Sequence, residues 1–135
     1  MLNTQLSNTT VNAQASVFAA LCDDGFLRLY DGIQPTTAEE AITTQRLGVI
    51  IKFGTPAFSE PVNGLITSNP MTAGIAIKSI EPTWARVFKS DGATVVGDFS
   101  AGDVDANAII GAFTIGTTVN CTSFSHQVLN SYVGL

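Results

Sequence analysis

The sequence predicts an all-β fold, a β-sandwich or jelly-roll-like domain that carries one N-terminal α-helix. About seven or eight short segments rich in threonine, valine and isoleucine are separated by turn signals, which is typical of such folds. Only one stretch, near the N-terminus, has apolar residues at helical spacing. Because its 135 residues show no internal repeat and no linker, we expect one domain over residues 9–135, preceded by a flexible polar arm over residues 1–8.

Residues 83–99 are expected to form a β-hairpin on which the other strands pack. The first arm places Trp84, Arg86 and Phe88 on one face, because successive side chains of a strand point to opposite faces. Asp91-Gly92 is the predicted turn, since glycine tolerates the positive φ that hairpin turns need. The only tryptophan of the chain lies here, so this hairpin carries a large apolar area to bury.

A helix is predicted over residues 9–22. Apolar residues recur at spacings of four, three and four, which places Val11, Ala15, Phe18 and Cys22 on one stripe. Thr10 or Asn8 is expected to cap its start, and Asp23-Asp24-Gly25 to end it with Gly25 in the left-handed conformation. We expect the stripe to pack across the sheet, as most short helices do; docking of a partner on this helix is the alternative.

Further strands are predicted along the rest of the chain. They are Gly25–Tyr30, Leu47–Phe53, a short strand that starts at Leu65 and Ile66 and is ended by Pro70, Ile75–Ile80, Ala108–Ile115 and Thr118–Val128. The nearly continuous apolar run Leu47–Phe53 is typical of a strand that is buried on both faces. Thr37–Glu40 matches a capping box and predicts a short helical turn, whereas Gly102–Asn107 is expected to be a polar loop.

The charge and composition of the chain limit the kinds of partner it can have. A net charge of −5 with only six scattered basic residues argues against nucleic acid, whose phosphates require clustered Lys and Arg. No run approaches the roughly 20 apolar residues of a membrane helix, and the first ten residues lack the regions of a signal peptide. We therefore expect neither nucleic acid nor a membrane as partner. Because only 13% of residues are charged, the chain suits a subunit that buries surface against neighbours; a merely neutral, threonine-rich surface is the alternative.

His126 is the only histidine and the one candidate for a catalytic base. Ser123 and Ser125 lie near it in the sequence, but Ser125 would point to the opposite face of a strand. No nucleophile-elbow motif accompanies them. We therefore expect His126 to pack on a strand and the protein not to be an enzyme, with no catalytic residues and no cofactor.

Residues 103–107 have the D-x-D-x-N spacing that opens a calcium loop, to which Asp98 could add an oxygen. The remainder of that pattern fails, because Ala108 stands where glycine is needed and Thr114 where a bidentate glutamate belongs. A solvated loop whose carboxylates hold turn amides is the favoured interpretation, and no metal site is predicted.

Cys22 and Cys121 are expected to be buried, reduced thiols, although the sequence leaves a pairing open. Together with one histidine they do not complete a four-ligand zinc site without a carboxylate. Glu39 and Glu40 are neighbours on a predicted helical turn, so they diverge and favour its N-terminus by charge.

Arg86 lies between Trp84 and Phe88 on one strand face, where it could stack on a ring or pair with a carboxylate. Sugar-binding modules use exposed Trp and Tyr in this way. A lectin-like role would therefore need Trp84 or Tyr30 at the surface, whereas the simpler expectation is that Trp84 is part of the core.

Taken in order, these segments resemble a family of small virion proteins of tailed bacteriophages. The resemblance extends from about Val11 to Phe124. It is carried by LRLYDGIQP (Leu27–Pro35), PAF (Pro56–Phe58), NGLIT (Asn63–Thr67), TWARVFKSDGATVV (Thr83–Val96), GDVDAN (Gly102–Asn107) and VNCTSF (Val119–Phe124). All of these are strand and turn pieces rather than chemical signatures.

The resemblance implies an all-β structural protein of the particle, a cement or decoration protein on the capsid surface of the virion, assembled in the host cytoplasm. Such proteins typically bridge capsomers as dimers or trimers, which makes the major capsid protein and copies of the chain itself the expected partners. A tail or neck component and a carbohydrate-binding adhesion module are the alternatives. The expected contact segments are residues 1–10, Thr55–Pro70 and Asn130–Leu135, because each is irregular or terminal and lies outside the predicted core.

Overall fold

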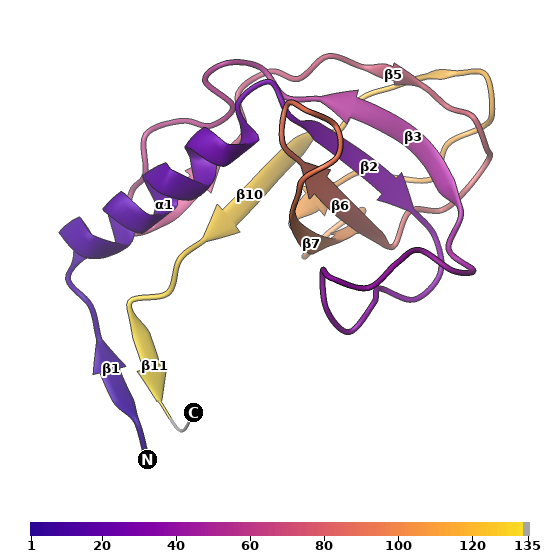
Figure 1. The fold of residues 1–135 in the computed structure, drawn as a ribbon. Coiled ribbons are helices and arrows are strands. Elements are labelled where there is room, and N and C mark those ends of the chain that lie inside the picture. The colour runs from indigo at the N-terminus through magenta and orange to yellow at the C-terminus, as the bar shows by residue number, and fades with distance from the viewer. Residues whose placement is uncertain (134–135) are drawn as a thin grey trace.

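The computed structural model describes residues 1–133 and shows one helix beside a strand-rich body (Figure 1). Strands make up 37% and helix 11%, which confirms the predicted all-β class with one helix. The elements are β1 (Asn3–Gln5), α1 (Asn8–Cys22), β2 (Phe26–Tyr30), β3 (Leu47–Lys52), β4 (Leu65–Thr67), β5 (Gly74–Ile75), β6 (Trp84–Phe88), β7 (Val95–Gly102), β8 (Ala108–Ile109), β9 (Thr118–Val119), β10 (Ser123–Gln127) and β11 (Ser131–Val133). Within residues 1–133, no helix has the length and apolar character needed to span a membrane.

Helix α1 begins after Ser7, whose hydroxyl oxygen accepts a hydrogen bond from the backbone N–H of Thr10 at 3.2 Å. Thr10 and Asn8, the caps expected from the sequence, instead lie inside the helix. The cap must be the last residue with extended backbone, and Ser7 meets this condition with φ −68° and ψ 157°. The predicted inward stripe is confirmed, with Val11, Ala15 and Cys22 buried and Phe18 packed against the core.

The end of α1 differs from the prediction in one detail. Asp24 rather than Gly25 adopts the left-handed backbone, with φ 55°. A short polar side chain tolerates this conformation better than most. Gly25 is needed for a different reason, because a Cβ at this position would lie 2.3 Å from the carbonyl oxygen of Phe88. The absence of a side chain therefore lets the chain enter β2 close beside β6.

Seven strands form one mixed sheet in the order β3-β2-β6-β7-β8-β10-β4. Neighbouring strands are antiparallel except β7 and β8, which run parallel. The predicted hairpin is confirmed as β6 and β7, paired from Trp84↔Ser100 to Phe88↔Val95. Because β2 pairs with β6 and β8 with β7, the other strands of this sheet extend outward from the hairpin on both sides.

The two faces of β2 and β6 are both covered. Leu27, Leu29, Ala85 and Val87 belong to the main hydrophobic core. Trp84 and Tyr30 occupy the alternate positions, and their rings stack with centroids 4.6 Å apart outside that core. Trp84 is fully buried, as predicted, but it lies on this second face.

The sheet is curled around its core. Phe53 directly follows β3 at one end of the strand order, and Phe124 lies on β10 near the other end, yet their ring centroids are 5.8 Å apart. Phe58 packs against both rings, at 5.5 Å and 5.8 Å. The two ends of the sheet therefore meet through tilted and edge-to-face aromatic contacts, which are the favoured arrangements of such rings.

Both outer edges of this sheet are covered by the chain itself. Next to β3, the backbones of Lys52 and Thr72 exchange hydrogen bonds of 3.1 Å and 2.8 Å, and Ile77 N–H donates to the Gly48 carbonyl. Next to β4, Ser59 N–H donates to the Thr67 carbonyl at 2.9 Å. Since an open edge is a template for pairing with other chains, segments 72–77 and 59–62 close the sheet to such pairing.

Several predicted strands are shorter than the alternation suggested. The strand expected over Ile75–Ile80 is wrong beyond Ile75, because the pairing partner changes along it: Ala76 N–H donates to Thr117 and Ile80 N–H to Phe113. For the same reason Ala108–Ile115 and Thr118–Val128 contain only the short strands β8, β9 and β10. The helical turn predicted at Thr37–Glu40 is present only as a turn closed by one hydrogen bond, in which Glu40 N–H donates to the Thr37 carbonyl at 3.2 Å.

A two-stranded ribbon of β1 and β11 projects from the body below the start of α1, with the N-terminus at its tip (Figure 1). Its pairs run from Asn3↔Val133 to Gln5↔Ser131, and Leu6 N–H donates to the Asn130 carbonyl at 2.7 Å. The expectation of a flexible arm over residues 1–8 is corrected for this part, because residues 3–5 are held in a β-ladder and Asn8 already belongs to α1.

Asp91 holds the turn of the β6–β7 hairpin. Its carboxylate accepts hydrogen bonds from the Thr94 hydroxyl at 2.5 Å and from the backbone N–H groups of Thr94 and Ala93 at 2.8 Å and 2.9 Å. Gly92 supplies the predicted positive φ, 68°. The Thr94 hydroxyl, followed by the two backbone groups, favours the ionised form and lowers the pKa of Asp91 from 3.8 to about 2.

We expect this carboxylate to make stability pH-dependent at the acid end. The folded pKa lies below the unfolded one, so the unfolded chain binds the proton first on acidification. The contribution is complete above about pH 4 and is lost as the pH falls through about 2. Urea unfolding of the wild type and Asp91→Asn should therefore show a free-energy difference at about pH 5 that narrows by about pH 2. A difference that does not change with pH would contradict this role.

Candidate functional site

His126 lies on β10, half-buried between two aromatic rings. Its ring centroid is 4.4 Å from that of Phe18 on α1 and 5.6 Å from that of Phe99 on β7. Burial lowers the pKa of the imidazole. The Ser125 hydroxyl is engaged elsewhere, 3.5 Å from the hydroxyl of Thr67. The arrangement therefore packs His126 between helix and sheet and forms no nucleophile–base pair with its neighbour.

A shallow cavity of about 340 Å³ opens beside His126, and its lining includes Ser100, Asp105, Asn107 and Gln127. Two polar side chains of this lining, Ser100 and Asn107, already have hydrogen-bond partners. Asn107 Oδ1 accepts from the backbone and hydroxyl of Ser100 at 3.2 Å and 3.0 Å, while its Nδ2 donates to the Ser125 carbonyl at 3.0 Å. Asn107 therefore ties β7 to β10, a structural role that its place in the D-x-D-x-N pattern did not reveal.

The carboxylates of the calcium-like loop do not converge. Asp98 is paired with Arg86, whereas Asp103 and Asp105 are exposed on the loop after β7. Across residues 1–133, no three side chains of His, Cys, Asp or Glu come close enough to hold a metal ion. Cys22 and Cys121 are buried, free thiols, and burial raises their pKa values to about 12 and about 11.

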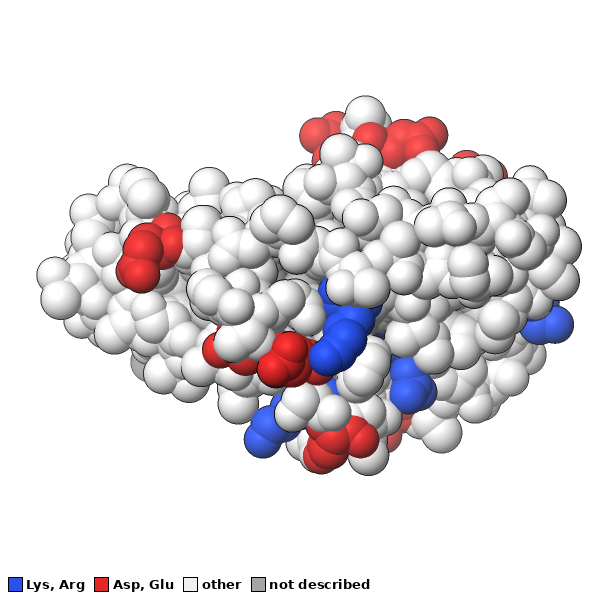
Figure 2. Space-filling view, turned by 90° about the horizontal axis from the view of Figure 1, so that it is seen from above, with Lys and Arg blue, Asp and Glu red and all other residues white. Residues whose placement is uncertain are grey.

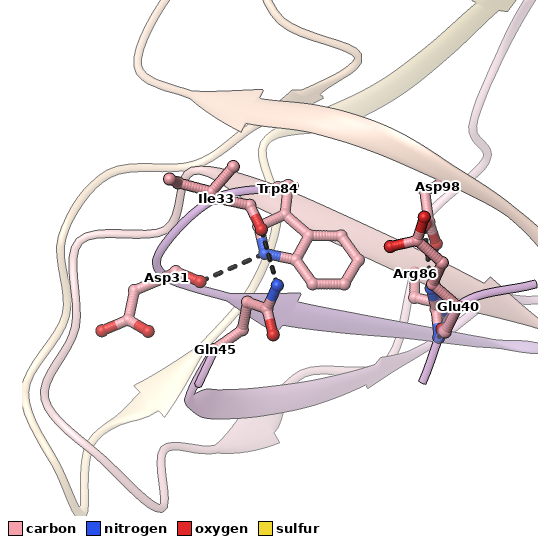
Figure 3. A network of polar contacts seen from close by, with 7 residues as sticks. All are labelled: Asp31, Ile33, Glu40, Gln45, Trp84, Arg86 and Asp98. Atoms are coloured by element: carbon pink, nitrogen blue, oxygen red, sulfur yellow. Dashed lines mark hydrogen bonds and ion pairs between the residues drawn. The ribbon is translucent and has the colours of Figure 1, made fainter. Parts of the chain in front are cut away.

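Arg86 forms a buried ion pair with Asp98 (Figure 3). The guanidinium donates through Nε to Oδ1 at 2.6 Å and through Nη2 to Oδ2 at 2.9 Å, and Nη1 donates to the Glu40 carbonyl at 2.8 Å. Its central carbon also lies 5.5 Å from the centre of the Trp84 ring. Arg86 therefore both pairs with a carboxylate and stacks beside a ring, and its hydrogen bond with Asp98 raises the pKa of the guanidinium.

The loop 31–46 covers Trp84 and Tyr30, which are 0% and 4% exposed. Trp84 Nε1–H donates to the Asp31 carbonyl at 3.1 Å, and Gln45 Nε2–H donates to the Ile33 carbonyl at 2.7 Å (Figure 3). Neither ring is available as a platform for a sugar, so the condition set for a lectin-like role is not met. Glu40 contributes its carbonyl rather than its side chain, which no side-chain pattern could have indicated.

Asp31 and Arg46 close the base of this loop. The Asp31 carboxylate accepts from the backbone N–H and from Nε–H of Arg46, both at 2.8 Å. Partial burial opposes ionisation of Asp31, but the hydrogen bonds and charge of Arg46 outweigh it and lower the pKa of that carboxyl. Long loops without secondary structure are often functional, and this one serves as the cover of the second sheet face.

The remaining candidate is a surface defined by its lack of charge. Every Asp, Glu, Lys and Arg of the chain lies within residues 23–60 or 78–105, so residues 1–22, 61–77 and 106–135 carry none. We call the part of the molecule formed by α1, β4, β10 and the β1–β11 ribbon the charge-free end, because none of these elements has a charged side chain; Glu60, in the segment before β4, lines a groove beside α1. Seen from above, the left end of the molecule, where α1 lies, is almost free of charged side chains (Figure 2).

The charge-free end brings together the three segments expected to make contacts. Residues 1–10 pair with the C-terminal segment through β1 and β11. The turn within Thr55–Pro70 lies next to both of them, because Gly64 N–H donates to Oδ1 of Asn12, just after the first segment, at 2.8 Å, and the Gly64 carbonyl accepts from Val128, just before the third, at 2.9 Å. Residues 134 and 135 of the third segment lie outside the described residues.

Exposed apolar side chains cover this end. They are Met1, Leu2, Val17, Leu21, Val62, Leu65 and Leu129. Val17 and Leu21 lie one turn apart on the outer side of α1 and are 64% and 40% exposed. The sequence prediction used only the inward stripe of the helix and so missed Val17 and Leu21. They could have been found as a second apolar pair on a helix that has no charged residue.

Comparison with protein-family models, curated proteins and solved structures finds no match to this chain. The fold defines the class as an all-β protein with one helix. Its candidate functional feature is the charge-free, partly apolar end.

Proposed function

We propose that this chain is a virion structural protein of a tailed bacteriophage, a capsid cement or decoration protein. It binds the outer surface of the capsid and stabilises the contacts between capsomers. Its partners are the major capsid protein and further copies of itself.

One observation carries this proposal: three segments that are distant in sequence come together at one end of the molecule, where Glu60 is their only charged residue and apolar side chains are exposed. Burying charges in an interface costs free energy unless each is paired, so the cores of protein interfaces are depleted of charged residues. A surface that is free of charge and partly apolar can be covered by a partner without that cost.

The charged residues lie on the rest of the molecule, which would then face solvent. Each copy contributes a modest contact, and copies arranged by the symmetry of a shell add their contacts through avidity. A small protein of this kind can therefore hold neighbouring capsomers together although each contact is weak.

The proposal predicts that a charge placed on the outer side of α1 weakens capsid binding. Val17→Glu adds a carboxylate that docking would desolvate without a partner, so binding should weaken at least about tenfold. The measurement is co-sedimentation of purified chain with capsids that lack it. The matched control is Ile77→Glu, which adds the same charge to another exposed aliphatic side chain outside the charge-free end.

Wild-type binding to capsids, lost in Val17→Glu and kept in Ile77→Glu, supports both the function and the surface. Binding lost only in Ile77→Glu would move the contact to the β3–β5 side of the molecule. No binding of the wild type to capsids would contradict the capsid role, and co-sedimentation with isolated tails instead would favour the tail or neck alternative.

A further inference from the structure

Both strands of the β1–β11 ribbon have an open edge in the part of the chain that the structure describes. Within residues 1–133, β1 pairs only with β11 and β11 only with β1, whereas both edges of the seven-stranded sheet are covered by segments 72–77 and 59–62. All three residues of β1 are exposed. Natural proteins protect open edges with lysine, proline or bulges, and β1 has none of these.

The sequence around β1 is nearly symmetric about Thr4. Residues 2–6 read Leu-Asn-Thr-Gln-Leu, so the order of side-chain types is the same in both directions: aliphatic, amide, hydroxyl, amide, aliphatic. Such a strand is self-complementary in an antiparallel pair. Thr4 would meet the partner's Thr4, a favourable cross-strand pair, while Asn3 would meet the partner's Gln5 and Leu2 the partner's Leu6, so that amide faces amide and aliphatic faces aliphatic.

We propose that two copies of this chain associate by antiparallel pairing of their β1 strands, centred on Thr4. The two ribbons then form one continuous four-stranded sheet. This inference rests on the proposed function, which requires copies of the chain to contact one another. It deepens that function by naming the strand and the residue pairs through which two copies would meet.

The backbone of β1 is oriented for this pairing. Leu6 N–H donates to Asn130, so residue 6 and, by the alternation of an antiparallel ladder, residue 4 direct their backbone groups toward β11. Asn3 and Gln5 consequently direct theirs to the open edge. In the proposed register, Asn3 exchanges hydrogen bonds with the partner's Gln5, while Thr4 faces the partner's Thr4 at a closely spaced, non-hydrogen-bonded position.

Three observations favour a second copy as the occupant. The near-symmetric sequence fits its own reverse, and an isologous contact of this kind closes at a dimer. A two-stranded ribbon is marginal in water, and two further strands add backbone hydrogen bonds to it. The chain has a net charge of −5, yet residues 1–22 and 106–135 carry no Asp, Glu, Lys or Arg, so no like-charged side chains from these ranges face each other when two copies meet here.

The test places charges at position 4 and measures solution mass by light scattering over about a hundredfold range of concentration. The wild type should show about twice the 14.1 kDa of one chain. Thr4→Lys alone and Thr4→Glu alone should each raise the dimer dissociation constant at least about tenfold, because like charges directly opposite are destabilising. An equimolar mixture of the two variants should restore the dimer, since Lys then faces Glu.

The matched control is Thr36→Lys, an exposed threonine on the loop 31–46, which should leave the dimer unchanged. A wild type that is monomeric throughout would overturn the proposal, as would Thr4 variants that dimerise like the wild type or a mixture that stays monomeric. The measurement uses the chain without capsids, so it separates the two proposals. Capsid binding by a monomeric wild type would leave the proposed function standing and remove only the self-contact.

Discussion

Replacing Asp98 with alanine is expected to lower the free energy of unfolding by about 3–5 kcal/mol. Arg86 is 4% exposed, and Asp98 accepts two of its hydrogen bonds at 2.6 Å and 2.9 Å. Without the carboxylate, the buried guanidinium of Arg86 keeps its hydrogen bond to the Glu40 carbonyl and its contact with the Trp84 ring but loses the negative charge that pairs with it. Since a domain is stable by only about 5–15 kcal/mol, this loss is a large part of the total and is measurable by urea unfolding.

The control for this prediction is the double variant Arg86→Met/Asp98→Leu. Replacing both members of a buried ion pair with apolar residues is often close to neutral, because no charge is left without a partner. The double variant should therefore be more stable than Asp98→Ala, although it also loses the hydrogen bond to Glu40. A loss below about 1 kcal/mol for Asp98→Ala would show that the ion pair is worth no more than an exposed one.

Replacing Phe124 with alanine is expected to lower the free energy of unfolding by about 3–5 kcal/mol, because it leaves a cavity where the two ends of the sheet meet. The Phe124 ring is fully buried and packs on Phe53, Phe58 and Phe99 with centroid distances of 5.8 Å, 5.8 Å and 5.1 Å. No other described ring contacts all three of these phenylalanines within the same distances.

Phe124→Leu serves as the matched variant, since it keeps an apolar side chain at the centre of the cluster. It should cost less than the alanine variant, about 1–2 kcal/mol. The comparison is made from urea midpoints at equal slope, so that a change in stability is separated from a change in compactness. Equal losses for leucine and alanine would contradict the view that the volume of the ring holds the curled sheet together.

Local patterns predicted the central elements of the fold well. The alternation of residues 26–30 and 84–88 and the spacing of Val11, Ala15 and Phe18 are properties of single segments, and each is confirmed. The Asp91-Gly92 turn is also encoded locally, since glycine meets the φ requirement and aspartate binds the backbone two and three residues ahead.

The failures concern relations between segments. Residues 75–80 alternate like a strand, but their hydrogen-bond partners change from one residue to the next, and the alternation carries no information about partners. The ribbon is a similar case, because Asn3–Gln5 shows no apolar alternation and forms a strand only by pairing with residues 131–133. Backbone acceptors such as the Glu40 carbonyl leave no trace in the sequence.

The candidate surface was partly visible in the sequence. The three contact segments were expected from their irregular or terminal character, and the charge-free stretches can be located from composition alone. Their assembly at one end could not be predicted, because it depends on contacts such as Gly64 with Asn12 and Val128, which join parts of the chain far apart in sequence.

Hydrogen exchange of the backbone amides, compared between the free chain and the chain bound to capsids, tests the central claim most directly. Docking through the charge-free end predicts slower exchange in α1, β4, β10 and the β1–β11 ribbon on binding, with little change in the loop 31–46 and the hairpin turn at Asp91. New protection confined to that loop and turn, with unchanged exchange in α1 and the ribbon, would contradict the account.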